Sequence, residues 1–353
     1  MGRSVTGDAT TTDDGPLQYD VIAEGLCNVE GPTLGPGGWL LNVCSVSRKT
    51  ELWQTQGGDI TATRIDAPRE THVLLSTSTD TVDGIPAGLA FGPDQAMYVC
   101  DEGRRSIVRV GPDGSVVDFV AEYDGGPING PNDLAFDPEG NLFFTDPWTS
   151  SPRNPVAAVY GYDWAASTLH LVDSGMQFTN GIVATSTHLY VAETYTRTVW
   201  VYDIVGAGRA TNRRRFCVLP DVADPPILPP AIREVVGVDY VVGPDGMCLD
   251  DAGRLYVAHY GGSAVYVYDS SGHERSLIET PGRFPTNVCF GGRDMRTLFI
   301  SVDDPGIIIA VQPGTQGRRL PFCPAAVSNH AFGALLAPGG AGGVLRDNRR
   351  SLV

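Results

Sequence analysis

The chain has 353 residues, of which 42% are hydrophobic, and it carries a net charge of -16 with a single lysine, Lys49. This acidic balance excludes the basic face that nucleic-acid binding requires, and no apolar run approaches the length of a membrane span. We therefore expect a protein that acts on a small molecule as a monomer or homodimer, with neither nucleic acid nor membrane as a partner. The 43 glycines and 26 prolines favour many short strands and turns over long helices.

The N-terminal residues 1–16, "MGRSVTGDATTTDDGP", contain no apolar segment, and we predict that they are disordered. The seven cysteines form no CxxC pair, and several lie in apolar stretches such as "MYVCDE" and "GMCLDD". Buried free thiols are the simplest interpretation. They point to a reducing compartment, and hence to a cytoplasmic protein.

A repeated unit dominates the rest of the chain. Each copy has a short entering strand, a turn rich in Gly, Asp or Pro, and a second strand rich in β-branched and aromatic residues. The six copies start at Glu30, Ala87, Asn132, Asn180, Asp245 and Thr286. Such a period predicts an all-β fold, a six-bladed β-propeller over residues 17–337. Residues 17–29, or the C-terminal stretch "FGALLAP", should supply the strand that closes the ring, and residues 338–353 should form a flexible tail.

The first residue of each unit is the position that varies. In a propeller this residue lies where the innermost strand of a blade enters the central channel, so all six meet at one mouth. Four of them carry oxygen donors: Glu30, Asn132, Asn180 and Asp245. Two carboxylates and two amides form an all-oxygen set that favours one divalent cation, Ca²⁺ first, with Mg²⁺, Mn²⁺ or Zn²⁺ as alternatives. In the competing interpretation, these side chains only cap strand ends by bonding backbone amides.

Other polar and aromatic side chains should gather at the same mouth. Asp133 follows Asn132 and should point the other way and brace the loop, although it could still reach the site. The second strands return to this mouth, and His259 at the end of one is the histidine candidate for proton transfer, or else a structural histidine. Trp148, Tyr195 and Tyr260 follow such strand ends as candidate walls of a substrate pocket. The stretch "DVADPPILPPAIREVVGVDYVVGPDG" runs into Asp245 and predicts a stiff lid or specificity loop.

Several stretches together resemble the SMP-30/gluconolactonase/luciferin-regenerating-enzyme family of six-bladed propellers. They are "EGPTL", "NGPNDLAFDPEGNLFFTDP", "FTNGI", "PDGMCLDDAGRLYVAHYGG" and "FPTNVCFGGRDMRTLFIS". The resemblance implies one catalytic divalent metal, calcium or zinc, held by the same four residues, and hydrolysis of a lactone. Two departures put sugar lactones in doubt. Gly130 stands where some sugar-lactone members have arginine, and Glu193 stands where aspartate is common.

The resulting hypothesis is a metal-dependent lactonase in which Asp245 is the general base or, alternatively, the nucleophile. One rival keeps the site but changes the reaction, to phosphotriester hydrolysis or to a ring rearrangement in a biosynthetic pathway. The other is a propeller without catalytic activity that serves as a protein-binding platform. No Gly-x-Ser-x-Gly motif supports a serine hydrolase.

Overall fold

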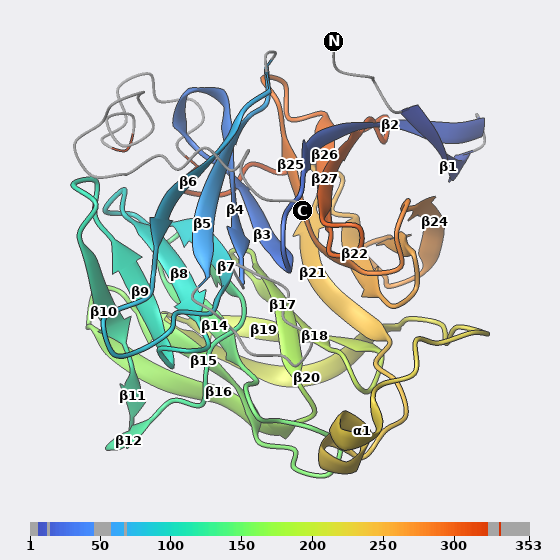
Figure 1. The fold of residues 1–353 in the computed structure, drawn as a ribbon. Coiled ribbons are helices and arrows are strands. Elements are labelled where there is room, and N and C mark those ends of the chain that lie inside the picture. Colours follow the sequence, from blue (N-terminus) through green and yellow to red (C-terminus); the bar gives the residue numbers. More distant parts are fainter. Residues whose placement is uncertain (1–5, 13–14, 46–57, 67–68, 324–331, 333–353) are drawn as a thin grey trace.

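The computed structural model describes residues 6–12, 15–45, 58–66, 69–323 and 332. Six antiparallel sheets stand around a central axis, as Figure 1 shows. Their innermost strands contact one another in the order β3, β7, β13, β17, β21, β25 and back to β3. The predicted six-bladed β-propeller is confirmed, and each of the six repeats supplies the two inner strands of one blade.

The blades follow the chain, and each is listed from its innermost strand outward. Blade 1 comprises β3 (Val29–Leu34), β4 (Trp39–Cys44), β5 (Asp59–Arg64) and β6 (Thr71–Ser76). Blade 2 comprises β7 (Pro86–Phe91), β8 (Met97–Asp101), β9 (Ser106–Val110) and β10 (Val116–Val120). Blade 3 comprises β13 (Leu134–Phe136), β14 (Leu142–Asp146), β15 (Ala157–Asp163) and β16 (Thr168–Met176).

Blade 4 comprises β17 (Thr179–Ala184), β18 (His188–Glu193), β19 (Thr198–Gly206) and β20 (Arg209–Val218). Blade 5 comprises β21 (Gly243–Leu249), β22 (Leu255–Tyr260), β23 (Ala264–Tyr268) and β24 (Glu274–Glu279). Blade 6 comprises β25 (Pro285–Gly291), β26 (Thr297–Val302), β27 (Ile307–Val311), β2 (Gly15–Glu24) and β1 (Thr6–Thr12). Outside the blades lie the 3₁₀ turn η1 (Pro36–Gly38), the short hairpin of β11 (Glu122–Tyr123) and β12 (Gly126–Pro127), and the helix α1 (Pro230–Val236).

The ring closes between the two ends of the chain. Strand β2 pairs with β27, so the first and last parts of the propeller share one sheet, and the blue and orange ribbons lie side by side in Figure 1. The closing strand therefore comes from the N-terminal candidate segment. Within "FGALLAP" only Phe332 is described, and the expected tail 338–353 lies outside the described residues. Residues 6–12, expected to be disordered, form β1 instead, because the outer edge of β2 offers it unpaired backbone groups.

Neighbouring blades pack face to face, which buries the middle strands on both sides. Phe143 and Phe144 are adjacent in β14, point to opposite faces, and are both fully buried in different apolar clusters. This explains why strands such as "LFFTD" and "LYVAH" read as continuous apolar runs rather than as alternating ones. All seven cysteines are free thiols, as expected. Among the described residues, no helix has the length and apolar character needed to cross a membrane.

Candidate functional site at one mouth of the channel

The four predicted oxygen donors lie at the end of the channel where the innermost strands begin, which we call the mouth. Glu30, Asn180 and Asp245 lie near the starts of β3, β17 and β21, and Asn132 comes two residues before β13. Asn180 and Asp245 are buried, with exposed fractions of 8% and 5%. Glu30 and Asn132 are half-buried. Hydrogen-bond register shifts at or beside this position in several blades, including those of Glu30 and Asp245, and such bulges re-aim side chains.

Three carboxyl groups crowd one another here. The pKa of Glu30 is raised to about 8, first by burial and then by the negative charge of Asp133. The pKa of Asp245 is also raised strongly, by burial and then by Glu30 and Asp133. Burial raises the pKa of Asp133 to about 7, although its carboxylate accepts hydrogen bonds from the backbone N–H groups of Leu134 (2.8 Å) and Ile182 (3.2 Å). Asp133 therefore faces the site, contrary to the expectation that it points away from Asn132.

The two asparagines are oriented by their neighbours. Asn132 Nδ2 donates to Glu102 Oε1 at 2.9 Å, and Asn180 Nδ2 donates to Thr194 Oγ1 at 3.2 Å. Asn180 also forms a hydrogen bond that lowers the pKa of Asp245. Because both amide nitrogens are engaged, the amide oxygens are the atoms left to act as acceptors.

The residues present fit a hard divalent cation. In the described part of the chain, no ion pair joins Glu30, Asp133 or Asp245 to an arginine. No positively charged side chain there offsets the repulsion among these carboxylates. Carboxylate and amide oxygens are the ligands that Ca²⁺ prefers. The described residues hold no group of three His, Cys, Asp or Glu side chains spaced as metal ligands, so the candidate set is mixed: two carboxylates and two amides.

A second ring of side chains surrounds the donors at the ends of the second strands. It consists of Glu102, Thr194 and Asp303, which follow β8, β18 and β26, and of Tyr260, the last residue of β22. Glu102 is buried and contacts Asn132, and burial raises its pKa to about 8. Burial raises the pKa of the Tyr260 hydroxyl, and the charges of Asp303, Asp245 and Glu30 raise it further. Glu102 could not be identified from the sequence, because its neighbour Asp101 is also acidic and ends β8.

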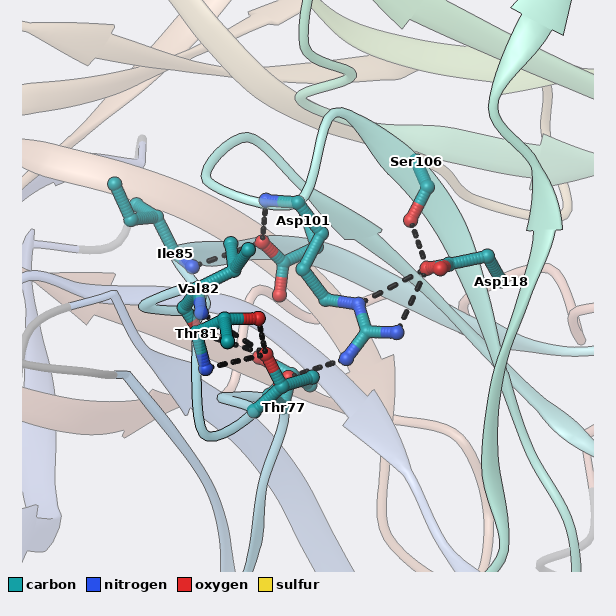
Figure 2. A network of polar contacts seen from close by, with 9 residues as sticks. Thr77, Thr81, Val82, Ile85, Asp101, Ser106 and Asp118 are labelled. Atoms are coloured by element: carbon teal, nitrogen blue, oxygen red, sulfur yellow. Dashed lines mark hydrogen bonds and ion pairs between the residues drawn. The ribbon is translucent and has the colours of Figure 1, made fainter.

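The last residues of β8 and β14, Asp101 and Asp146, point away from the axis and stabilise nearby turns by accepting hydrogen bonds from backbone N–H groups. Asp101 Oδ1 accepts a hydrogen bond from the backbone N–H of Ile85 (2.9 Å), as Figure 2 shows. It accepts another from the backbone N–H of Arg104 (2.8 Å). Asp146 accepts hydrogen bonds from the backbone N–H groups of Asn129 and Gly130, in the loop that leads into β13 of the same blade. Alternation along a strand explains the division, since adjacent residues face opposite sides.

His259 belongs to this outward-facing group and does not join the carboxylates. Its side chain is fully buried, and neither ring nitrogen has a hydrogen-bond partner in the structure. Burial lowers its pKa to about 4, with Arg197 lowering it further and Asp221 opposing. Its ring meets Tyr266 edge-on at 5.3 Å between centroids. This environment is that of a neutral structural histidine.

The channel narrows just below the donors. The next residue in each inner strand is glycine in four blades, but Asp133 in blade 3 and Asn287 in the opposite blade 6. A hydrogen bond from Asn287 lowers the pKa of Asp133, so the two side chains meet across the axis. Glycine is required beside them, because a Cβ at Gly88 would lie 2.2 Å from Asp133 Oδ1. Beyond this pair lies a cavity of about 400 Å³, whose lining contains none of the four donors.

Aromatic side chains stand at the mouth. Tyr260 packs against Phe284 with 4.9 Å between ring centroids, and Tyr195 meets Phe178 edge-on at 6.0 Å. Tyr195 also contributes to the raised pKa of Tyr260, after the larger effects of burial and of the carboxylates. Trp148, 37% exposed, follows β14. The structure thus places Tyr260 near the carboxylates and leaves Trp148 partly open to solvent beside Gly130.

The insertion between β20 and β21 lies on the same face as the mouth, because β20 ends there and β21 begins there. It contains α1, which starts with Pro230 at its first position and ends at Gly237 in the left-handed conformation. Arg153, in the loop after β14, donates a hydrogen bond from its guanidinium to the Glu234 carbonyl. The insertion therefore connects the mouth side of blade 3 with the start of blade 5.

Known proteins resemble the chain over most of its length. The family model described as "SMP-30/Gluconolactonase/LRE-like region" matches residues 46–303. The diisopropyl-fluorophosphatase of Loligo vulgaris is 26% identical over 317 residues, 85% of this chain and 94% of that enzyme. The gluconolactonase of Zymomonas mobilis is 31% identical over 229 residues, 61% of this chain and 60% of that enzyme.

Solved structures agree on the fold. A gluconolactonase from Xanthomonas campestris superposes with a TM-score of 0.68 at 23% identity, covering 88% of this chain and 97% of that one. The calcium-binding regucalcin of Agrobacterium tumefaciens gives 0.64 at 17% identity, covering 90% and 97%. Lactonases and a fluorophosphatase among the relatives support a hydrolase. Because the family model matches well over half of its residues, the chain belongs to the SMP-30/gluconolactonase/LRE-like family.

Proposed function

We propose that the protein is a divalent-cation-dependent hydrolase that opens lactones. The observation that carries this proposal is the meeting of Glu30, Asp245 and two oriented asparagines, in which burial and repulsion raise the pKa of both carboxyls. Such a cluster is stabilised by a cation, and Ca²⁺ is the metal that this set of oxygens favours. Glu30, Asn132, Asn180 and Asp245 would hold it. When bound, the cation would act as a Lewis acid toward the carbonyl oxygen of the substrate.

The side chains of the site divide the remaining work. Asp245 accepts the proton of the attacking water, whose oxygen forms the new bond to the carbonyl carbon. The ring C–O bond then breaks, the proton passes to the leaving alkoxide, and a hydroxy acid results. Glu102 and Thr194 hold the amide groups of Asn132 and Asn180 in place. When Asp133 is ionised, its negative charge raises the pKa of Asp245 and so the basicity of that carboxylate.

Removal and restoration of the metal tests the proposal directly. The purified protein is treated with a chelator, dialysed, and supplied with Ca²⁺, Mg²⁺, Mn²⁺ or Zn²⁺ in turn, while acid release from a lactone is followed with a pH indicator. We expect activity to disappear with the chelator and to return best with Ca²⁺. Full activity in the chelated, metal-free protein would contradict the proposal.

The role of Asp245 has its own test. Asp245→Asn should lower kcat by at least about 100-fold even with excess cation. A single turnover in H₂¹⁸O separates the two routes. A general base leaves ¹⁸O in the product, whereas direct attack by Asp245 puts the label into the protein and an unlabelled oxygen into the first product. Wild-type turnover by the asparagine variant would exclude both roles.

A second candidate is phosphotriester hydrolysis at the same site. The similarity to a protein named diisopropyl-fluorophosphatase, over 85% of the chain, favours it. A panel containing a sugar lactone, an alkyl lactone and a fluorophosphate diester, each assayed with the restoring metal, distinguishes the two by kcat/KM.

A further inference from the structure

We infer that the mouth selects lactones that carry an apolar substituent rather than polyhydroxylated sugar lactones. This inference rests on the proposed function and names its substrate class. It comes from the side chains that surround the four donors rather than from the donors themselves.

The first observation concerns the residue that lies two positions before the first residue of each repeat. These residues lie at the mouth, since in five blades their carbonyls accept hydrogen bonds from backbone N–H groups just beyond the second strands, those of Ser45, Glu102, Trp148, Thr194 and Asp303. Around the ring they are Asn28, Ile85, Gly130, Phe178, Gly243 and Phe284. Only one of the six, Asn28, carries a polar side chain. A sugar lactone presents several hydroxyl groups, and a rim of this kind offers them few hydrogen-bond partners.

The second observation is that aromatic rings fill one side of the mouth. They form two pairs: the ring centroids of Phe178 and Tyr195 lie 6.0 Å apart, and those of Tyr260 and Phe284 lie 4.9 Å apart. All four rings are half-buried, so each keeps a face or edge toward solvent. Tyr260 links its pair to the site, because the charges of Asp245 and Glu30 act on its hydroxyl.

The backbone conformation of Phe178 indicates that its ring has a role at the mouth. Phe178 has φ of 63°, in the left-handed region that a bulky residue rarely adopts. Its counterpart in blade 3 is Gly130, also at positive φ (149°), where the conformation is far less costly. Retaining a phenylalanine in a strained conformation beside Asn180 is expected where the ring itself is needed.

The third observation is that Trp148 takes the space of a side chain at position 130. A Cβ placed on Gly130 would lie 2.5 Å from Trp148 Cβ and 3.0 Å from Trp148 Cγ. No polar group can therefore be provided at this position, two residues from Asn132. Instead the indole, 37% exposed, stands there as an apolar wall. A substituent on the lactone ring can be covered by aromatic groups from blade 3 and from blades 4 to 6.

The experiment compares two lactones of the same ring size, δ-decalactone with its alkyl chain and glucono-δ-lactone with its hydroxyls. We expect the wild type to favour δ-decalactone in kcat/KM by about tenfold or more, the equivalent of about 1.4 kcal/mol. Trp148→Ala and Phe284→Ala should each lower that ratio by about fivefold to tenfold. Trp39→Ala is the matched control, since Trp39 is also half-buried but begins β4 at the opposite end of the blade. It should leave the ratio unchanged.

A binding measurement separates failure of this inference from failure of the proposed function. The corresponding lactams, an alkyl-substituted one and a polyhydroxylated one, are titrated by calorimetry into the metal-loaded protein. Tighter binding of the alkyl lactam, weakened in Trp148→Ala, supports the apolar rim even if no lactone is hydrolysed. Equal or tighter binding of the hydroxylated lactam, or a wild-type preference for glucono-δ-lactone, overturns the inference and leaves lactone hydrolysis untouched.

Discussion

His259 offers a sharp test of the environment that the structure assigns to it. In the folded protein its pKa is lowered to about 4, chiefly by burial, from an ordinary value of 6.5. Neither ring nitrogen has a hydrogen-bond partner, so the neutral imidazole contributes as an apolar ring. His259→Phe removes the titration and keeps a planar ring against Tyr266. It adds volume next to Gly262, which costs a fixed amount that does not depend on pH.

Proton linkage gives the direction in which the stability of the wild type changes with pH. Between pH 6.5 and about 4 the unfolded chain binds a proton at this histidine and the folded chain does not, so the wild type loses stability as the pH falls through this window. Each pKa unit corresponds to about 1.4 kcal/mol, so the loss relative to His259→Phe amounts to about 3 kcal/mol by pH 4. The carboxyls with raised pKa values, such as Glu30 and Glu102, have the opposite pH dependence. Because the two proteins share them, they cancel in the difference.

The assay is denaturant unfolding of both proteins, followed by tryptophan fluorescence at half-unit steps from pH 7.5 to pH 4. We expect the two midpoints to differ by a constant amount above pH 6.5 and to shift in favour of the variant below it. The variant should also retain kcat, since His259 is fully buried and away from the carboxylates. Parallel curves over the whole range, or a kcat lowered more than about tenfold, would refute this account of the histidine.

Three further substitutions test the packing and orientation of the site. Gly88→Ala should destabilise the protein by about 2 kcal/mol or more, measured by denaturant unfolding, because its Cβ would overlap Asp133. Gly206→Ala is the control, because a Cβ at Gly206 would lie in open space. If it lowered the stability as much as Gly88→Ala does, overlap with Asp133 could not be the cause. Glu102→Ala should weaken Ca²⁺ binding in calorimetry by about 10-fold to 100-fold, since Asn132 loses its acceptor. Glu102→Gln keeps an acceptor oxygen and should bind more tightly than the alanine variant. Equal affinities would mean that the hydrogen bond does not orient Asn132.

The architecture could be predicted from sequence because the strand–turn–strand pattern of one blade occurs six times along the chain. Each unit carries its own strand, turn and strand, so an error in one copy is corrected by the others. The first residue of each unit identified Glu30, Asn180 and Asp245 for the same reason, since one position in register marks one level of the channel. What could not be read was the direction of individual side chains. Alternation predicts that Asp133 faces away from the site, but its carboxylate faces the axis, among Glu30 and Asp245.

A difference of one residue also decides which side chains at the ends of the second strands face the axis. Asp101, the last residue of β8, and His259, the last but one of β22, face away from the axis. The residues after them, Glu102 and Tyr260, face it. The motif "CDEG" contains both acidic residues, and no local signal says which one turns inward. The register of β8 against β7 decides it, and that register is set by a bulge between Pro86 and Leu89.

The pair formed by Asp133 and Asn287 separates the site from the rest of the channel. The two side chains come from opposite blades and meet across the axis, and glycines in the other four blades allow the backbone to close around them. The cavity on the far side is therefore separated from the four donors, and none of them lines it. In the described part of the chain, the mouth with its aromatic rim is therefore the side from which a substrate reaches the donors. Asp133 and Asn287 are hydrogen-bonded to each other, so the side chains left to contact a substituent of the substrate are those of the rim.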